Sequence, residues 1–457
     1  MYDLIIIGGG PGGYMAAERA GHAGLKMLLI EKRALGGVCL NEGCIPSKTL
    51  LHSAKLLDYA KHGNVYGVYS GNARPEIDHK HVIERKNKVV ETLVNGVKAL
   101  MKANKVTVVY GEAQIIDKSS VKVGDELYNG NRLMIATGSV PVVPPIEGLA
   151  DGLEKGFVLT SREILDLEKV PKHLVVIGGG VVGLEMASYY NAAGSKVTVI
   201  EMLPKIAGAT DTEISDFLMR SYEKKGIEFL LDTKVTAIAK NSVIYNDGSN
   251  KTDEPSPCLL KADKVLLSIG RKPLIEGFGL ESLDLVIENG AIKTDSVGQT
   301  SQPNVYAVGD VNGKYMLAHA AYREAEVAVA HMLGKKDEMQ YDAVPSVIYT
   351  SPEVASVGET EKSAKEKGID CATVTVPMIY SGRYIAENDV TDGICKVVIN
   401  KKHRNIIGVH LYGSYASEII TSACMMIEMQ MRIEDVQKFI FPHPTVSEMI
   451  REAVFRL

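Results

Sequence analysis

The chain has little cysteine, no long apolar run and no excess of basic charge, and each shortage excludes a class of protein. Six cysteines in 457 residues, at positions 39, 44, 258, 371, 395 and 424, are too few and too scattered for a disulfide framework. No apolar run approaches the roughly 20 residues of a membrane span. The N-terminus enters DLIIIGGG without a basic segment or a cleavage site. We therefore expect a cytoplasmic protein with no membrane partner.

Charge and composition indicate a folded, water-soluble chain of several domains. The formal net charge is −5, and the acidic and basic residues are interspersed, so no basic stripe is available for a phosphate backbone. We expect no nucleic-acid partner. Hydrophobic residues make up 46% of the chain, which is ordinary for a globular protein. The length predicts roughly three domains of about 150 residues each.

One pattern of strand, glycine-rich turn, helix and strand occurs twice. The first copy has a strand at 4–8, a helix at 14–23 and a strand at 27–30 that ends at Glu31. The second has a strand at 174–178, a helix from about 184 and a strand at 196–200 that ends at Glu201. The same 170 residues separate the first glycines and the two acids of the copies. Two such units predict two dinucleotide sites, because each offers one helix N-terminus to one pyrophosphate.

The glycines of both turns have the dinucleotide-binding spacing. The first allows a tight turn, the second lets a pyrophosphate approach the backbone, and the third lets the helix pack closely. They are Gly8, Gly10 and Gly13 in the first copy and Gly178, Gly180 and Gly183 in the second. Glu31 and Glu201 stand where a ribose could be held, and a carboxylate at Glu201 favours NAD over NADP because it repels a 2′-phosphate. That Glu201 merely ends a strand in solvent remains the alternative.

Later segments indicate where the domains end. NRLMIATG and ADKVLLSIG read as late strands that close the two sheets near Gly138 and Gly270. Proline-rich segments follow both, so we expect boundaries near 145 and 270. From about 341 alternating strands, including 396–399 and 406–411, and helices from Ala416 and Thr445 indicate a separate α+β domain.

Cys39 and Cys44 are the only two cysteines close together in the sequence. On one regular helix their Cβ atoms would diverge, but Gly43 and Pro46 indicate an irregular helix start that permits a disulfide. A cysteine near a helix N-terminus has its thiolate stabilised by the helix dipole. A metal site lacks a second ligand pair. Two buried, inert thiols remain the alternative.

The segment GGVCLNEGCIPSK resembles the redox signature of the two-dinucleotide flavoprotein disulfide reductases. The similarity continues through IATG at 135–138, TSQPNVYAVGD at 300–310 and HPTVSE at 443–448. It implies an α/β fold with two Rossmann-like dinucleotide-binding domains, for FAD and NAD, and a C-terminal α+β dimerisation domain. The expected parts are 1–145 for FAD, 146–270 for NAD, 271–340 completing the FAD site, and 341–457 forming a homodimer.

The resemblance also implies roles for single residues. Cys39 resembles the thiol that exchanges with substrate, and Cys44 the thiol beside the flavin. Lys48 resembles the lysine beside the flavin, with Glu185 as its partner. His443 resembles the acid/base, oriented by Glu448, both supplied by the other subunit. The remaining residues that the family's motifs place at the cofactors are Thr137, Gly138, Gly270, Asp310, Met316, Leu317, Ala318 and His319.

Each late motif also permits a purely structural interpretation. Asp310 after Gly309 fits an ordinary turn at a strand end. Thr445 to Glu448 fits a capping box, in which case Glu448 would only cap a helix and His443 would be a bystander. The cysteine signature favours function, because thiol exchange needs a base that titrates near neutral pH, and histidine suits that role.

Among these reductases the chain is most similar to the dihydrolipoamide dehydrogenases. CLNEGCIPSK, MLAH at 316–319 and an NAD-type acid carry this resemblance. It implies oxidation of dihydrolipoamide with reduction of NAD⁺, and a lipoyl-bearing partner from a 2-oxoacid dehydrogenase or glycine cleavage complex. No lipoyl-carrying segment precedes Met1, so another protein would supply that group. The alternatives are an NAD(P)H-dependent reductase of another disulfide and a flavin-binding protein without turnover. Glu42, between the cysteines, departs from the family's apolar or small residue.

Overall fold

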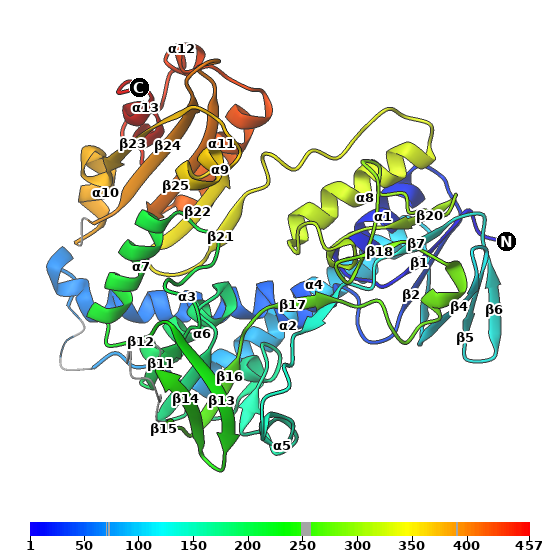
Figure 1. Ribbon diagram of the computed structural model, residues 1–457, viewed down its shortest axis with the longest axis horizontal. Coiled ribbons are helices and arrows are strands. Elements are labelled where there is room, and N and C mark those ends of the chain that lie inside the picture. The colour runs from blue at the N-terminus through cyan, green and yellow to red at the C-terminus, as the bar shows by residue number, and fades with distance from the viewer. Residues whose placement is uncertain (70, 72–73, 248–256, 390–391) are drawn as a thin grey trace. The chain divides into compact units, whose positions relative to one another are not determined.

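The computed structural model describes residues 1–457 except 70, 72–73, 248–256 and 390–391 (Figure 1). The chain divides into two compact units. The first contains Met1–Thr49, Ile83–Val143 and Gly270–Gln340, and the second contains Leu50–Val82, Pro144–Ile269 and Tyr341–Leu457. Two of the divisions fall within helices, α3 (Cys44–His62) and α4 (His79–Ala103). None of the described helices is long and apolar enough to cross a membrane.

The first unit is built on a parallel five-stranded sheet. Its strands lie in the order β20 (Val305–Ala307), β7 (Leu133–Ile135), β1 (Leu4–Ile7), β2 (Met27–Glu31) and β3 (Thr107–Tyr110). Alternate strand residues face opposite sides. Leu4 and Ile6 pack with α1 (Pro11–His22) and α8 (Ala318–Met332), whereas Ile5 and Ile7 pack toward the antiparallel strands β4 (Ala113–Asp117), β5 (Ser120–Val123) and β6 (Glu126–Asn129). Both faces are therefore buried, which explains the unbroken apolar run of β1.

The second unit contains another parallel sheet. Its order is β12 (Glu228–Leu230), β11 (Lys196–Ile200), β10 (His173–Ile177), β16 (Lys264–Leu267) and β9 (Val158–Leu159). Helices α6 (Val181–Ala192) and α7 (Thr212–Lys224) follow β10 and β11 in the chain, and an antiparallel sheet joins β13 (Thr233–Ala239), β14 (Ser242–Asp247) and β15 (Cys258–Lys261). Two shorter helices are α5 (Leu149–Glu154) and η2 (Glu163–Asp166).

The expectation that the late strands close their sheets is wrong. β7 lies between β1 and β20, and β16 lies between β10 and β9. β20 comes from residues about 170 positions after β7, and β9 precedes its sheet's first glycine turn. Hydrophobic periodicity indicates that a strand is buried, but it does not say which distant strand will pair with its outer edge.

The C-terminal part of the second unit is an antiparallel sheet covered by helices. Its strands lie in the order β21 (Ser346–Ile348), β22 (Glu353–Gly358), β25 (Ile406–Gly413), β24 (Ile394–Asn400) and β23 (Cys371–Pro377). Helix α11 (Ala416–Glu428) begins at the expected residue. The other helices are α9 (Glu361–Glu366), α10 (Gly382–Glu387), α12 (Ile433–Val436) and α13 (Glu448–Val454). α13 begins three residues after the expected Thr445, because the Thr445 amide bonds a side chain instead of continuing a helix.

Short elements link these layers. In the first unit they are α2 (Gly37–Glu42), β8 (Ser139–Pro141), β17 (Arg271–Pro273), η3 (Leu280–Leu283), β18 (Ile287–Glu288), β19 (Ala291–Ile292) and η4 (Asp310–Asn312). In the second unit they are η1 (Gly63–Tyr66) and η5 (Met378–Tyr380). β8 and β17 pair antiparallel, so the segment that leaves the first unit's sheet lies against the segment that returns to it. The two glycine-turn sheets and the C-terminal α+β layer confirm the predicted fold class.

Candidate functional site

The two glycine turns have the same geometry. Gly8 and Gly178 both adopt left-handed backbone angles, with φ of +103° and +102°. A Cβ atom at Gly8 would lie 2.2 Å from the carbonyl oxygen of Ala136, and one at Gly178 would lie 2.3 Å from that of Ser268. Both turns therefore exclude every residue with a side chain at this position.

The third glycine of each turn packs against the first, whereas the second glycine leaves open space. A Cβ at Gly13 would lie 1.8 Å from the carbonyl oxygen of Gly8, so no side chain fits between helix and turn. At Gly10 the nearest atom is 3.8 Å away, and at Gly180 nothing lies within 4 Å. Gly10 and Gly180 also cap α1 and α6 without a side-chain hydrogen bond. Each helix N-terminus thus has room and amide donors for a pyrophosphate, so the residues fit two dinucleotides.

The two strand-end acids are held by matching pairs of backbone amides. Glu31 accepts hydrogen bonds from the amides of Gly9 and Arg33, both at 2.7 Å. Glu201 accepts them from Gly179 at 2.7 Å and Leu203 at 2.8 Å. Each carboxylate is therefore fixed beside its glycine turn, and each oxygen keeps a lone pair for a ribose hydroxyl.

The cysteines lie on two successive helices. Cys39 is in α2 and Cys44 is the first residue of α3, and the two helices are separated at Gly43, where φ is −149° and ψ is −107°. Neither cysteine is in a disulfide in this structure. The predicted irregular start is confirmed, because the helix breaks between the cysteines.

The segment that carries the cysteines packs against the first glycine turn. The amide of Gly36 donates to the carbonyl oxygen of Gly9 at 2.8 Å. A Cβ at Gly37 would lie 2.6 Å from the Cα of Gly10. The two glycines before Cys39 therefore let the thiol helix approach the open space at the N-terminus of α1.

The two thiols influence each other's protonation. A hydrogen bond with Cys44, burial and the charge of Cys44 all raise the pKa of Cys39 far above its ordinary value, against a smaller opposing effect of Lys48. Asp310 raises the same pKa. Cys39 therefore holds its proton more tightly than an isolated thiol does. Among the described residues no group of histidines, cysteines and acids could hold a metal ion.

Asp310 is held by two residues that sequence reasoning missed. The hydroxyl of Ser139, in β8, donates to the Asp310 carboxylate at 2.5 Å. Arg271, in β17, donates from Nε to that hydroxyl and from Nη2 to the Ser139 carbonyl, both at 2.7 Å. Burial lowers the pKa of Arg271, and the charges of Asp310, Glu42 and Cys44 oppose this. The paired strands β8 and β17 thus bring a guanidinium and a hydroxyl to the expected flavin residue.

A buried acid organises the turn that carries Asp310. Glu324, in α8, is only 3% exposed and accepts hydrogen bonds from the Gly309 amide at 2.6 Å and the Asn312 side chain at 2.9 Å. The available sequence signal was an acid within the alanine-rich segment that follows MLAH. In that motif Met316, Leu317 and Ala318 are half-buried and His319 is exposed, with α8 beginning at Ala318.

The ends of both late strands are also open. Thr137 donates from its hydroxyl to the carbonyl oxygen of Leu274 at 2.8 Å. Gly138 and Gly270 have φ of +74° and +110°, and a Cβ at either would meet nothing within 4 Å. Each of these glycines therefore leaves room for a ligand beside it.

His443 and Glu448 form a pair in the second unit. Nδ1 of His443 lies 2.9 Å from one carboxylate oxygen of Glu448, and the Thr445 amide donates to the other oxygen at 2.8 Å. Burial raises the pKa of Glu448, but the Thr445 amide and His443 outweigh it and hold that pKa below its ordinary value. Glu448 therefore contacts the local backbone and the imidazole at the same time. It can cap the helix start and also orient the His443 ring.

The other two predicted charged residues, Lys48 and Glu185, belong to different units. Lys48 lies in α3, within the first unit. Glu185, in α6 of the second unit, is 2% exposed and accepts a hydrogen bond from the Tyr349 amide at 3.1 Å. Their pairing remains a prediction. Glu42 forms an ion pair with Arg33, which offsets the carboxylate that it places beside the cysteines.

Comparisons with known proteins agree with this arrangement. The family model for pyridine nucleotide-disulphide oxidoreductases matches residues 2–325, and the model for their dimerisation domain matches 344–454. Dihydrolipoyl dehydrogenase from Mycoplasma pneumoniae is 40% identical over 454 residues, which cover 99% of this chain and 97% of the relative. The mitochondrial dihydrolipoyl dehydrogenase of Pisum sativum is 39% identical over 463 residues, covering 99% and 90%.

A solved structure shares the whole fold. The HOCl-induced flavoprotein disulfide reductase RclA from Escherichia coli superposes with a TM-score of 0.86 at 28% identity, covering 99% of both chains. Matched by the family models over most of its length and by full-length relatives well above 30% identity, this chain belongs to the pyridine nucleotide-disulphide oxidoreductase family.

Proposed function

We propose that the protein is a dihydrolipoyl dehydrogenase, which oxidises dihydrolipoamide to lipoamide and reduces NAD⁺ with FAD as its bound cofactor. The observation that carries this proposal is the pair of interacting thiols on consecutive helices, packed against the first of two glycine turns. The full-length similarity to curated dihydrolipoyl dehydrogenases supports the choice of substrate.

The residues of each glycine turn have a distinct part in cofactor binding. The first turn, with Glu31, binds the FAD pyrophosphate and ribose, and Asp310 binds the flavin's ribityl and phosphate region. The second turn, with Glu201, binds NAD⁺ in the same way. Bound FAD would supply the electron and hydride transfer that connects the thiols to NAD⁺.

The thiol exchange proceeds through the cysteine pair. A dihydrolipoyl thiolate attacks the sulfur of Cys39 in the oxidised enzyme, which forms a mixed disulfide and releases Cys44 as a thiolate. The second lipoyl thiolate attacks the lipoyl sulfur of that mixed disulfide, which closes the lipoamide ring and releases Cys39. One substrate dithiol is thereby oxidised and one enzyme disulfide reduced.

His443 takes up the protons of the substrate thiols. Because Nδ1 points to the Glu448 carboxylate, Nε2 is left to accept a proton. The Thr445 amide holds the carboxylate in place, so the imidazole keeps one orientation. We propose that His443 and Glu448 serve the thiols of the other subunit of a homodimer.

The partners follow from the same chemistry. The dimerisation domain at 344–454 supports a homodimer. The substrate dithiol belongs to a lipoyl-bearing protein of a 2-oxoacid dehydrogenase or glycine cleavage complex. A reducing cytoplasm, in which exposed thiols stay available, is the compartment that we propose.

A second candidate is an NADH-linked reductase of another disulfide, which the shared fold with a flavoprotein disulfide reductase favours. The two are separated by measuring NAD⁺ reduction by the FAD-loaded protein with dihydrolipoamide, reduced glutathione and other dithiols. We expect dihydrolipoamide to be the preferred donor. Preference for another thiol would contradict the proposal in favour of the second candidate.

The thiol pair provides the sharper test. Cys39→Ser and Cys44→Ser should each abolish lipoamide turnover while the yellow flavin stays bound. Cys371→Ser, which changes a half-buried thiol at the start of β23, is the matched control and should remain active. Lipoamide turnover that survives in either redox variant would overturn the mechanism.

A further inference from the structure

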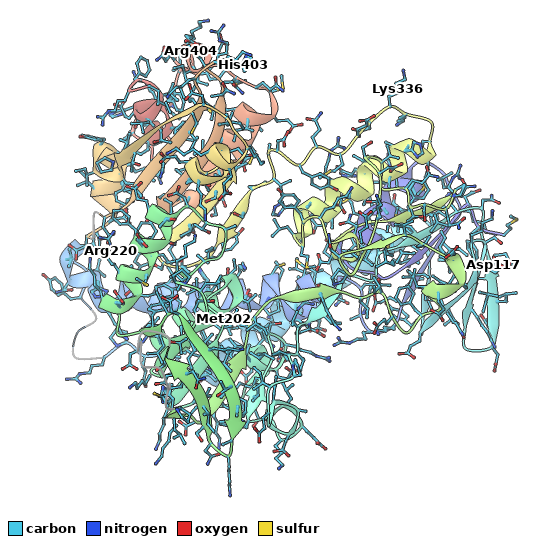
Figure 2. The ribbon with its side chains drawn as sticks, in the orientation of Figure 1. Asp117, Met202, Arg220, Lys336, His403 and Arg404 are labelled. Atoms are coloured by element: carbon cyan, nitrogen blue, oxygen red, sulfur yellow. The ribbon has the colours of Figure 1, made fainter. Side chains whose placement is uncertain are left out.

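The loop after Glu201 folds back over the second glycine turn. The amide of Leu203 donates to Glu201, and the amide of Ala207 donates to the carbonyl oxygen of Gly179 at 2.8 Å. Ile206 is 1% exposed, whereas Met202, labelled in Figure 2, is 63% exposed. The loop at 202–211 therefore lies against the turn on one side and faces solvent on the other.

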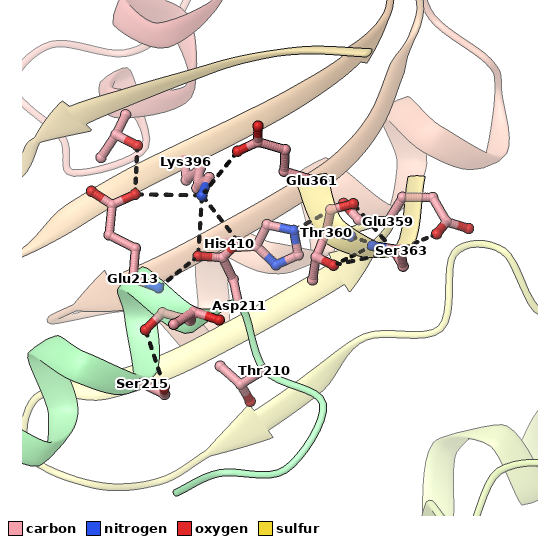
Figure 3. Close-up of polar contacts among 12 residues, drawn as sticks. Thr210, Asp211, Glu213, Ser215, Glu359, Thr360, Glu361, Ser363, Lys396 and His410 are labelled. Atoms are coloured by element: carbon pink, nitrogen blue, oxygen red, sulfur yellow. Dashed lines mark hydrogen bonds and ion pairs between the residues drawn. The ribbon is translucent and has the colours of Figure 1, made fainter. Parts of the chain in front are cut away.

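The loop ends at a buried aspartate. Asp211 is 6% exposed, and its Oδ1 accepts a hydrogen bond from the Glu213 amide at 3.1 Å, which caps α7. Nζ of Lys396 lies 3.2 Å from Oδ1 and 3.1 Å from Oδ2 of the same carboxylate. The Asp211 carboxylate thus connects the end of the loop and the start of α7 to a lysine of the C-terminal antiparallel sheet (Figure 3).

Lys396 belongs to β24 of the dimerisation domain, and its side chain is 10% exposed. Besides Asp211 its ammonium group lies 3.4 Å from Glu213 and 3.9 Å from Glu361 (Figure 3). The Glu213 carboxylate also accepts a hydrogen bond from the Thr375 hydroxyl at 3.0 Å. Three carboxylates therefore surround one buried ammonium group, and Asp211 is the nearest of them.

We propose that Lys396 is a positioning residue for NAD⁺ binding: by pairing with Asp211 it fixes the end of the loop that follows Glu201, and it does not touch the nucleotide. The inference rests on the proposed role of Glu201 in holding the NAD⁺ ribose. It makes the geometry of the nucleotide site depend on a side chain of the dimerisation domain.

The physical reason is the cost of ordering the loop. A buried ion pair contributes little net stability once both charges have lost water, but it defines one geometry. Without it the loop samples more conformations, and a nucleotide must restore the binding one before it gains its contacts. Affinity for the nucleotide then falls, whereas the steps after binding are unchanged.

Asp211→Asn is the most informative variant. Asparagine caps a helix as well as aspartate does, so α7 keeps its first hydrogen bond while the loop loses its charged partner. Lys396 retains Glu213 and Glu361, so the protein should fold. Lys396→Gln removes the other partner of the ion pair, and Lys396→Arg keeps the charge. Lys401→Met is the control, because Lys401 pairs with Asp370 near the surface.

The measurements are calorimetric titration of the FAD-loaded protein with ADP-ribose and steady-state KM and kcat. ADP-ribose lacks only the nicotinamide, so it probes the pyrophosphate and ribose contacts without the redox chemistry. For Asp211→Asn and Lys396→Gln we expect the Kd of ADP-ribose and the KM for NAD⁺ to rise about threefold to tenfold, as for other positioning contacts. The kcat at saturating NAD⁺ and the KM for dihydrolipoamide should not change. Lys396→Arg should recover most of the loss, and Lys401→Met should behave as the parent.

A parallel titration of Glu201→Gln separates the possible failures. If Glu201→Gln weakens ADP-ribose binding and Asp211→Asn does not, the inference is wrong and the proposed function stands. If Glu201→Gln has no effect, the proposed role of Glu201 fails and the inference falls with it. A drop in kcat without a change in the Kd of ADP-ribose would also overturn the inference.

Discussion

Replacing Glu448 with glutamine tests the proposed acid–base role of His443, because it removes one charge and keeps the shape of the side chain. In the parent the carboxylate accepts from His443 Nδ1 at 2.9 Å and from the Thr445 amide at 2.8 Å. A glutamine oxygen can keep the Thr445 bond, but its amide nitrogen then faces Nδ1. That arrangement favours the tautomer with the proton on Nε2, which cannot accept a proton from a thiol.

The magnitude follows from the hydrogen bond that is lost. Hydrogen bonds to a charged group contribute about 1.5–3 kcal/mol. His443 is 76% exposed in the single chain, where solvent weakens the interaction, so the lower end of the range applies. We therefore expect the kcat for dihydrolipoamide oxidation to fall roughly tenfold to thirtyfold.

The assay compares two reactions of the same variant. Dihydrolipoamide oxidation needs the base, whereas NADH-dependent reduction of ferricyanide bypasses the thiols and should keep its parent rate. Glu452→Gln is the control, because Glu452 lies in the same helix and pairs with Arg451 at 2.6 Å. Equal losses in both reactions, or parent-like lipoamide oxidation by Glu448→Gln, would refute the proposed role of the pair.

Three further predictions follow from separate parts of the structure. Glu201→Ala removes the acceptor fixed beside Gly179 and should weaken NADH binding about tenfold and relax discrimination against NADPH, and unchanged kinetics with both cofactors would contradict this. Ser139→Ala removes the hydroxyl that joins Arg271 to Asp310 and should weaken FAD binding about tenfold. On heating, the fluorescence of released flavin should then appear at a lower temperature than in the parent. Burial lowers the pKa of His410, so between the ordinary pKa of histidine and the lowered one only the unfolded chain binds the proton. Stability is then complete above about pH 6.5 and falls below it by up to about 1.4 kcal/mol per pH unit. Thermal unfolding of His410→Gln should show a weaker dependence on pH between 7 and 5, and an identical dependence would disprove this account.

The sequence by itself determined the features that depend on neighbouring residues. Strand β11 (Lys196–Ile200) has its predicted bounds, and α11 begins at Ala416 as expected, because alternation, helical periodicity and turn residues act over a few positions. The glycine turns belong to this class as well. Gly8 and Gly178 are required by backbone angles that hardly any other residue adopts, so their spacing was sufficient to predict two dinucleotide folds.

Only the tertiary structure decided which distant groups meet. The Ser139 hydroxyl reaches Asp310 across 171 residues, and Lys396 reaches Asp211 across 185. The edge positions of β20 and β9 likewise come from remote segments, which is why the predicted sheet edges were wrong. A hydrogen bond or an ion pair depends on distance in space. Local propensity does not predict that distance for residues that several helices and strands separate in the sequence.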